Sequence, residues 1–99
     1  LKMSAIRKAA RGEECTLNIA GVCSYDPETV VLCHFPSDSH GIGFKSPDVS
    51  AGFGCAKCHD ALDGRRAGLS REDKEFYMRR SQTRTLLRLI ERGIVRIEQ

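Results

Sequence analysis

Hydrophobic and polar residues alternate in short stretches in the first half of the chain, and these stretches predict strands. Residues 29–35 are β-branched and apolar and are closed by a proline, which is typical of a strand. A second strand is expected at residues 49–54, weakened by its glycines. Residues 36–47, between the two, are rich in Ser, Gly and Pro and predict a loop of a length that is often functional. Leu17 and Ile19 alternate with polar neighbours, so a strand-like hairpin is expected there too.

Three other stretches have helical character. A short helix is expected at residues 4–10, where Ser4 can cap it, and another from Cys55 to about Leu62. A capping sequence at Ser70 precedes a long helix with an apolar side, expected at about 70–92 with an interruption at 81–83. Residues 94–97 alternate like a terminal strand.

Composition narrows the class of protein. Ninety-nine residues make one domain, 1–99, whose core we expect at about 13–66. There is no apolar run long enough to span a membrane and no visible signal peptide. Five cysteines without an export signal point to a reducing compartment, where paired cysteines more often bind metal than form disulfides.

Charge is divided unevenly along the chain. Residues 1–64 hold 6 Lys and Arg against 8 Asp and Glu, whereas residues 65–99 hold 10 against 5. The basic part is nearly all arginine, which favours bidentate phosphate contacts, although a solvated helix face explains the charge equally well. If the partner is DNA, the arginines expected to touch backbone phosphates are Arg65, Arg66, Arg84 and Arg88.

Four cysteines have the pattern of a structural zinc site. Cys55 and Cys58 have the spacing of a zinc knuckle, while Cys15 and Cys23 are wider apart at the two ends of a predicted loop. The alternative is a set of buried, unliganded thiols. Cys33 lies on a predicted strand and is expected to be a packed thiol.

Two histidines and a carboxylate suggest a second site. On a helix His59 and Asp63 share a face, and His34 lies on the strand that precedes it. This is the layout of a ββα-metal nuclease, in which His59 and Asp63 would hold a divalent cation such as Mg²⁺ and His34 would be the general base. Spacing alone leaves two alternatives open. His34 could be a core histidine with His59 a zinc ligand, or Cys55-x-x-Cys58-His59 could be a c-type haem attachment sequence.

Two further residues could join that site. Asp48, just before the second strand, could orient His34 through a hydrogen bond or could be a turn residue. His40 lies in the long loop and is a candidate metal ligand, or simply a solvated side chain.

An ordered series of motifs runs from Arg7 to Asp63. The series comprises Arg7-Lys-Ala-Ala-Arg-Gly12, Glu14-Cys15, Ile19-x-Gly-Val-Cys23, Pro27-Glu-Thr29, His34, Gly41-x-Gly43-x-Lys45-x-Pro-Asp48, Cys55-x-x-Cys58-His59-Asp60 and Asp63. In this series the chain resembles the YbcO-like proteins of lambdoid phages and prophages. The Arg-rich last third is only loosely similar.

The resemblance implies a small HNH-type nuclease with a ββα-metal core. It implies zinc at the four cysteines, a general base at His34, and a catalytic cation at His59 and Asp63. Cys33 occupies the position where many HNH enzymes place an extra metal ligand, and the middle Asn of the motif is not evident near Asp48.

Together these observations predict a zinc-stapled α+β domain with a basic C-terminal helix. The expected function is metal-dependent DNA cleavage in the cytoplasm of a bacterial host cell. The alternative is a non-catalytic zinc module that binds nucleic acid or a phage or host protein. The C-terminal helix could pair with a second copy to form a homodimer.

Overall fold

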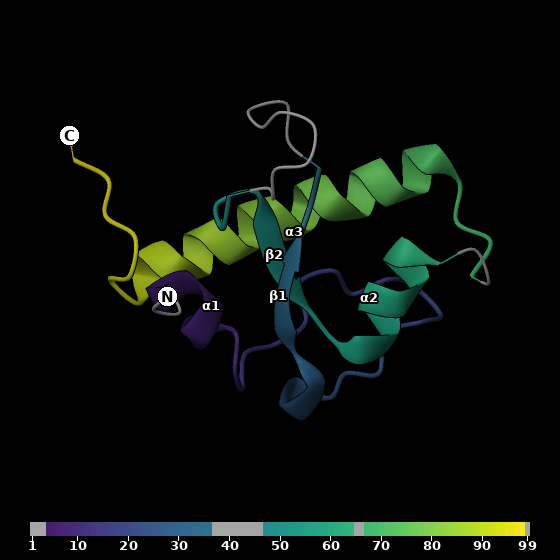
Figure 1. Cartoon of the computed structure of the whole chain (residues 1–99), viewed down its shortest axis with the longest axis horizontal. Helices are drawn as coiled ribbons and strands as arrows, with labels where there is room; N and C mark the ends of the chain where they lie inside the picture. The colour runs from purple at the N-terminus through teal and green to yellow at the C-terminus, as the bar shows by residue number, and fades with distance from the viewer. Residues whose placement is uncertain (1–3, 37–46, 65–66, 99) are drawn as a thin grey trace.

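The computed structural model describes residues 4–36, 47–64 and 67–98. Two strands lie at the centre, with a long helix across them and shorter helices to either side (Figure 1). In chain order the elements are α1 (Ala5–Ala9), a 3₁₀ turn (Pro27–Thr29), β1 (Val31–His34), β2 (Ala51–Gly54), α2 (Ala56–Asp63) and α3 (Arg71–Glu91). The fold is therefore α+β, as predicted.

The sheet has two strands, and α2 follows it directly. β1 and β2 are antiparallel, with Val31 opposite Gly54 and His34 opposite Ala51. His34 is thus the last residue of its strand, at the end from which the chain leaves β1. β2 is buried along its whole length and passes through Cys55 into α2.

All three α-helices of the described residues begin at a side-chain cap. The Ser4 Oγ accepts a hydrogen bond from the Arg7 N–H and so caps α1. Cys55 does the same for α2, where its Sγ accepts from the Cys58 N–H. α3 begins at Ser70, whose hydroxyl accepts from the Asp73 N–H. The predicted starts of all three helices are therefore confirmed.

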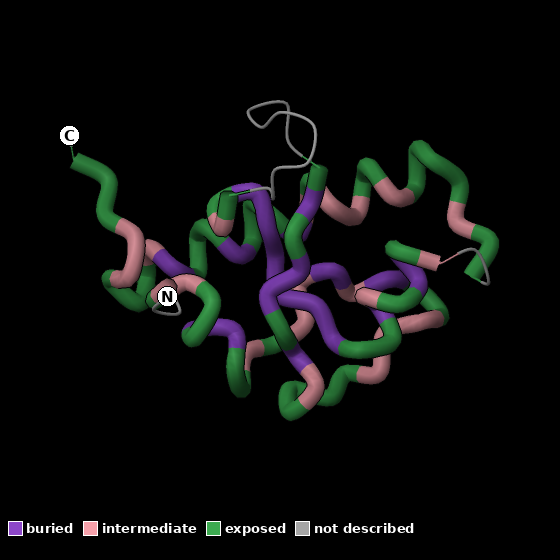
Figure 2. Tube along the Cα trace, viewed as in Figure 1, coloured by how far each residue is buried: buried purple, intermediate pink, exposed green. Residues whose placement is uncertain are grey.

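The hydrophobic core lies between the sheet and the segment that precedes it (Figure 2). Leu17, Ile19 and Phe53 are almost completely buried. The core also takes in Ala10 beside α1 and Leu89 of α3, so both outer helices are packed onto the sheet.

α3 docks on β2 through small residues and hydroxyl groups. The Phe53 N–H donates to Thr85 Oγ1, and the hydroxyl of Thr16 lies 2.7 Å from that of Ser81. A Cβ placed on Gly52 would lie 2.0 Å from Ser81 Oγ, so only glycine allows this approach. The interruption expected at 81–83 is wrong, because the helix is continuous. The buried hydroxyl of Ser81 bonds to that of Thr16, which also donates to the Phe53 carbonyl of β2.

Two predicted strands are also wrong. Leu17 and Ile19 are both buried, but Asn18 between them takes a φ of 40°, which is not an extended conformation. Ile94 and Val95 donate their N–H groups to the Leu89 carbonyl and so close the end of α3.

Candidate metal centre and active site

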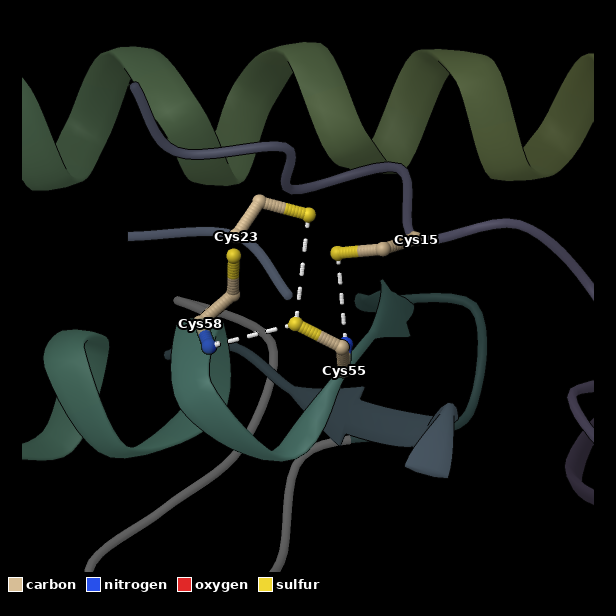
Figure 3. Close-up of side chains that lie close together, drawn as sticks. All are labelled: Cys15, Cys23, Cys55 and Cys58. Atoms are coloured by element: carbon tan, nitrogen blue, oxygen red, sulfur yellow. Dashed lines mark hydrogen bonds between the residues drawn. The ribbon is translucent and has the colours of Figure 1, made fainter. Parts of the chain in front are cut away.

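Four cysteine side chains meet at the junction of β2 and α2 (Figure 3). Cys15 and Cys23 come from the loop before β1, Cys55 lies between β2 and α2, and Cys58 lies in the first turn of α2. Their four sulfur atoms all lie within 4.8 Å of one another. The Sγ atoms of Cys23 and Cys55 are 3.9 Å apart. Zinc–sulfur bonds of about 2.3 Å arranged as a tetrahedron would place two sulfurs about 3.8 Å apart, so the set fits such an ion.

Backbone N–H groups point at three of these sulfurs. Cys15 Sγ accepts from Asn18 and from Cys55, at 3.4 Å and 3.2 Å. Cys58 Sγ accepts from the Ile19 N–H at 3.4 Å. Such donors stabilise negative charge on sulfur, as metal-bound thiolates require. The contact from the Asn18 N–H to Cys15 has the same three-residue spacing as the contact from the Cys58 N–H to Cys55.

The thiols of the cluster differ in acidity. Burial opposes ionisation of Cys55, but hydrogen bonds from the Ser24 hydroxyl and backbone and from Cys58 lower the pKa of this thiol to about 6. Burial, together with the neighbouring thiols, raises the pKa of Cys58 and of Cys23. Four like groups in one place cannot all ionise without a cation between them. The cluster could therefore hold a metal ion such as zinc.

Cys33 lies outside the cluster. Its side chain is buried against Gly54, where a Cβ would come within 2.7 Å of the Cys33 sulfur. Burial raises the pKa of this thiol to about 12, so it stays protonated. It is packed in the core, as the sequence predicted.

His34 and Asp48 form a hydrogen-bonded pair at the end of β1. His34 Nε2 lies 2.7 Å from Asp48 Oδ1. Because an ionised carboxylate only accepts, Nε2 is the donor in this bond, and Nδ1 is the ring nitrogen that a neutral imidazole would leave as acceptor. About a third of the His34 side chain is exposed. Such an imidazole can accept a proton from a bound molecule at Nδ1.

Asp48 is also held by α1. The Ser4 hydroxyl donates to Asp48 Oδ2, and Arg7 Nη2 lies 3.7 Å from Oδ1. The hydrogen bond from His34, then that from Ser4, lowers the pKa of Asp48, and Arg7 acts in the same direction. Asp48 therefore remains ionised across the neutral range and holds His34 in a single orientation.

His59 and Asp63 form the second pair that the sequence predicted. Their Nε2 and Oδ2 atoms are 3.1 Å apart on one face of α2. Both are substantially exposed, at 41% and 70% of their side chains. A divalent cation that keeps several of its waters needs only one or two protein ligands, and this pair offers an imidazole and a carboxylate.

The two pairs remain separate. Among residues 4–36, 47–64 and 67–98, the four cysteines are the one group of three or more metal-binding side chains with ligand atoms that close together. His34 with Asp48 and His59 with Asp63 each contribute two. The predicted ligand His40 lies outside the described residues.

The predicted phosphate-binding arginines have different surroundings. Arg88 Nε donates to both carboxylate oxygens of Glu13, at 2.9 Å and 3.1 Å, and Nη1 donates to Glu91. Arg84 is exposed and lines a polar cavity beside Cys15. Arg65 and Arg66 lie outside the described residues.

Ser4 and Arg7 are the contacts to Asp48 that sequence reasoning missed. The sequence marked Ser4 as a helix cap, which it is. Its second bond joins residues 44 positions apart, and no local pattern reports such a contact.

A sequence model of one family, described as "Putative nuclease YbcO", matches residues 4–94. The chain belongs to this family. Two relatives are each 48% identical over 64 residues, which is 64% of this chain and 67% of theirs. They are "Putative nuclease YbcO" of Escherichia coli strain K12 and "Putative nuclease ybcO" of Enterobacteria phage 82.

A solved structure also resembles this member of the YbcO family. It is that of a "putative bacteriophage protein" from Escherichia coli K-12 MG1655, with a TM-score of 0.74 and 34% identity. The match covers 90% of this chain and 100% of that one. Membership of the family, predicted from the motifs, is confirmed by the family model and the two relatives.

Proposed function

We propose that this protein is a metal-dependent endonuclease of the HNH type that hydrolyses DNA phosphodiester bonds. The observation that carries the proposal is the His34–Asp48 pair at the end of β1. A strand ending in an oriented imidazole, a second antiparallel strand and a helix with a metal-binding pair occur here in the order of a ββα-metal core. The family and relatives that carry the name nuclease support the same class of reaction.

In this proposal His34 is the general base. Its Nδ1 takes a proton from a water molecule, whose oxygen forms a bond to phosphorus as the bond to the leaving sugar oxygen breaks. Asp48 stabilises the imidazolium that results and keeps the ring in place, as carboxylates do for catalytic histidines. Asp48 is thus a positioning residue.

His59 and Asp63 would hold the catalytic cation, Mg²⁺ or another divalent ion. Such a cation supplies charge neutralisation at the scissile phosphate and at the leaving oxygen. Because the pair is exposed, a phosphate oxygen and water molecules can complete the coordination shell. His40 remains a candidate for a third protein ligand.

Zinc at Cys15, Cys23, Cys55 and Cys58 would have a structural role. All four positions are cysteine, so the site is closed by the protein, with no position for substrate. It would fasten the loop before β1 to the start of α2 and so fix the helix that carries His59 and Asp63.

DNA is the proposed partner, and no helix of the described residues is long and apolar enough to cross a membrane. Arg84 is free to meet backbone phosphates, whereas Arg88 would first have to leave Glu13. Phe76 and Leu87 of α3 are exposed apolar side chains that a second copy could cover in the proposed homodimer. The host cytoplasm remains the expected location.

The rival function is a zinc module that binds nucleic acid without cutting it. One observation favours it: in the described part of the chain only two side chains, His59 and Asp63, are placed together to hold the proposed cation. The two functions differ in the effect of replacing His34. The replacement abolishes DNA cleavage if the protein is a nuclease, and it leaves DNA binding unchanged in either case.

Plasmid nicking tests the proposal. Protein purified without chelator should contain one zinc per chain and should nick supercoiled plasmid with added Mg²⁺, Mn²⁺ or Ni²⁺. His34→Ala should abolish nicking while zinc content and DNA binding are retained. His59→Ala should have the same effect on cleavage. If wild type nicks no DNA with any of these cations, the enzyme proposal fails and the binding module stands.

A further inference from the structure

A groove with a volume of about 620 Å³ lies between α1 and the first strand of the sheet. Arg7, Lys8 and Arg11 line it from the side of α1. Val31 and Leu32 of β1 form its apolar floor.

The charged side chains that line the groove are all cations. Lys8 and Arg11 are exposed, and in the part of the chain that the structure describes no carboxylate pairs with either. Two basic side chains of α3 contrast with them. Arg88 is engaged by Glu13, and Arg80 donates to the Leu17 and Asn18 carbonyls. In the described part of the chain, Lys8 and Arg11 are therefore available for an external anion.

The groove leads toward His34. β1 continues from Val31 to His34, three residues further, which is about 10 Å at the usual rise of a strand. One strand of DNA advances about 3.4 Å per nucleotide along the duplex axis, and because the backbone winds around that axis its neighbouring phosphates lie about 7 Å apart, so this span corresponds to one or two nucleotides. Arg7 joins the two places, because it lines the groove and also reaches Asp48.

We propose that this groove binds the backbone of the nucleic-acid strand being cut. Lys8 and Arg11 would bind a phosphate one or two nucleotides from the cleaved bond, with the sugars of the strand lying on Val31 and Leu32. The distance to the cleaved bond rests on the function proposed above. The binding of a polyanion in the groove does not.

Salt-dependent binding tests the groove without any cleavage. A short fluorescein-labelled DNA duplex is titrated with wild type, with the double variant Lys8→Gln/Arg11→Gln and with the control Arg71→Gln/Arg79→Gln, without added divalent cation. The control removes the same charge from exposed positions in the first half of α3, where Arg71 lies 3.8 Å from Glu75. Losing two phosphate contacts should reduce the slope of log K against log salt by about 1.8 and weaken binding by one to two orders of magnitude at about 0.1 M salt. The control should change neither.

A neutral phosphate analogue tests the position. A single methylphosphonate is placed at each phosphate near a mapped cleavage position. In wild type, the analogue one or two nucleotides away should weaken binding. In the Lys8→Gln/Arg11→Gln variant it should have no further effect, because its partners are gone.

The outcomes separate this inference from the proposed function. Equal losses in the groove variant and the α3 control, or an unchanged salt slope in the groove variant, would overturn the inference even if wild type cleaves DNA. A groove-specific loss in a protein that never cleaves would support the groove and refute the endonuclease.

Discussion

Asp48→Asn is the substitution that tests the proposed catalytic pair most directly. The amide keeps the shape of the carboxylate and can still accept a hydrogen bond from His34 Nε2. It removes the negative charge that would stabilise a protonated His34 and that lies 3.7 Å from Arg7. Geometry is thus preserved while the electrostatic support for the base is lost.

The contact sets the size of the effect. The His34–Asp48 bond is 2.7 Å long, and 33% and 23% of the two side chains remain exposed, so the charges are only partly screened. A hydrogen bond to a charged partner is worth about 1.5–3 kcal/mol, against about 1 kcal/mol for the neutral bond that Asn retains. The difference, about 0.5–2 kcal/mol of transition-state stabilisation, lowers kcat about 2- to 30-fold.

This effect is measured as the rate of plasmid nicking under single-turnover conditions, with enzyme in saturating excess over plasmid. The thermal unfolding of each variant is measured alongside. Ser4→Ala is the matched control, because it removes the other bond to Asp48 and the cap of α1 but leaves His34 paired. It should lower stability by about 1 kcal/mol and leave kcat nearly unchanged. If Ser4→Ala slows cleavage as much as Asp48→Asn does, the effect comes from loosening α1 and the reasoning about His34 is refuted.

Three further predictions concern stability. Cys58→Ser should lose both the bound metal and cooperative unfolding, whereas Cys33→Ala should keep one zinc per chain. Elemental analysis measures the zinc and calorimetry measures the unfolding. A Cys33→Ala variant without zinc would show that Cys33 is a ligand. Gly52→Ala should destabilise the fold by about 1–3 kcal/mol, because its Cβ would meet Ser81. The loss of stability should be smaller in a Ser81→Ala background. Equal losses in both backgrounds would rule out the contact with Ser81 as the cause. Since the pKa of Asp48 is lowered below its ordinary 3.8 in the folded state, its contribution is complete above pH 3.8 and is lost as pH falls through the lowered value. Unfolding curves of wild type and Asp48→Asn should therefore differ at pH 7 and converge in strong acid, and a constant difference would contradict this.

The secondary structure was predictable where the pattern was local and strong. The caps at Ser4 and Ser70 and the apolar run before Pro36 gave the right elements near the right residues. The errors fall where tertiary contacts override local pattern. Asn18 leaves the extended conformation although its neighbours alternate, and Ile94 turns back to the end of α3.

The candidate site was predictable as pairs but not as a whole. Spacing alone places His59 beside Asp63, and the knuckle pattern identifies two of the four clustered cysteines. The pairing of Asp48 with His34 could be proposed because both flank the predicted loop. The groove could not, since it depends on how α1 lies against β1, and no residue pattern encodes that packing.

Cys55 directly follows β2, caps α2 and contributes a sulfur atom to the cysteine cluster. α2 has only eight residues, fewer than the about 12–15 at which even a helix-favouring peptide becomes marginally stable on its own. Its formation is thus tied to the events that bring the four thiols together. If the proposals above hold, a newly synthesised chain would be inert until it acquired its metal. The onset of DNA cleavage in the cell would then follow the supply of zinc more closely than the rate of translation.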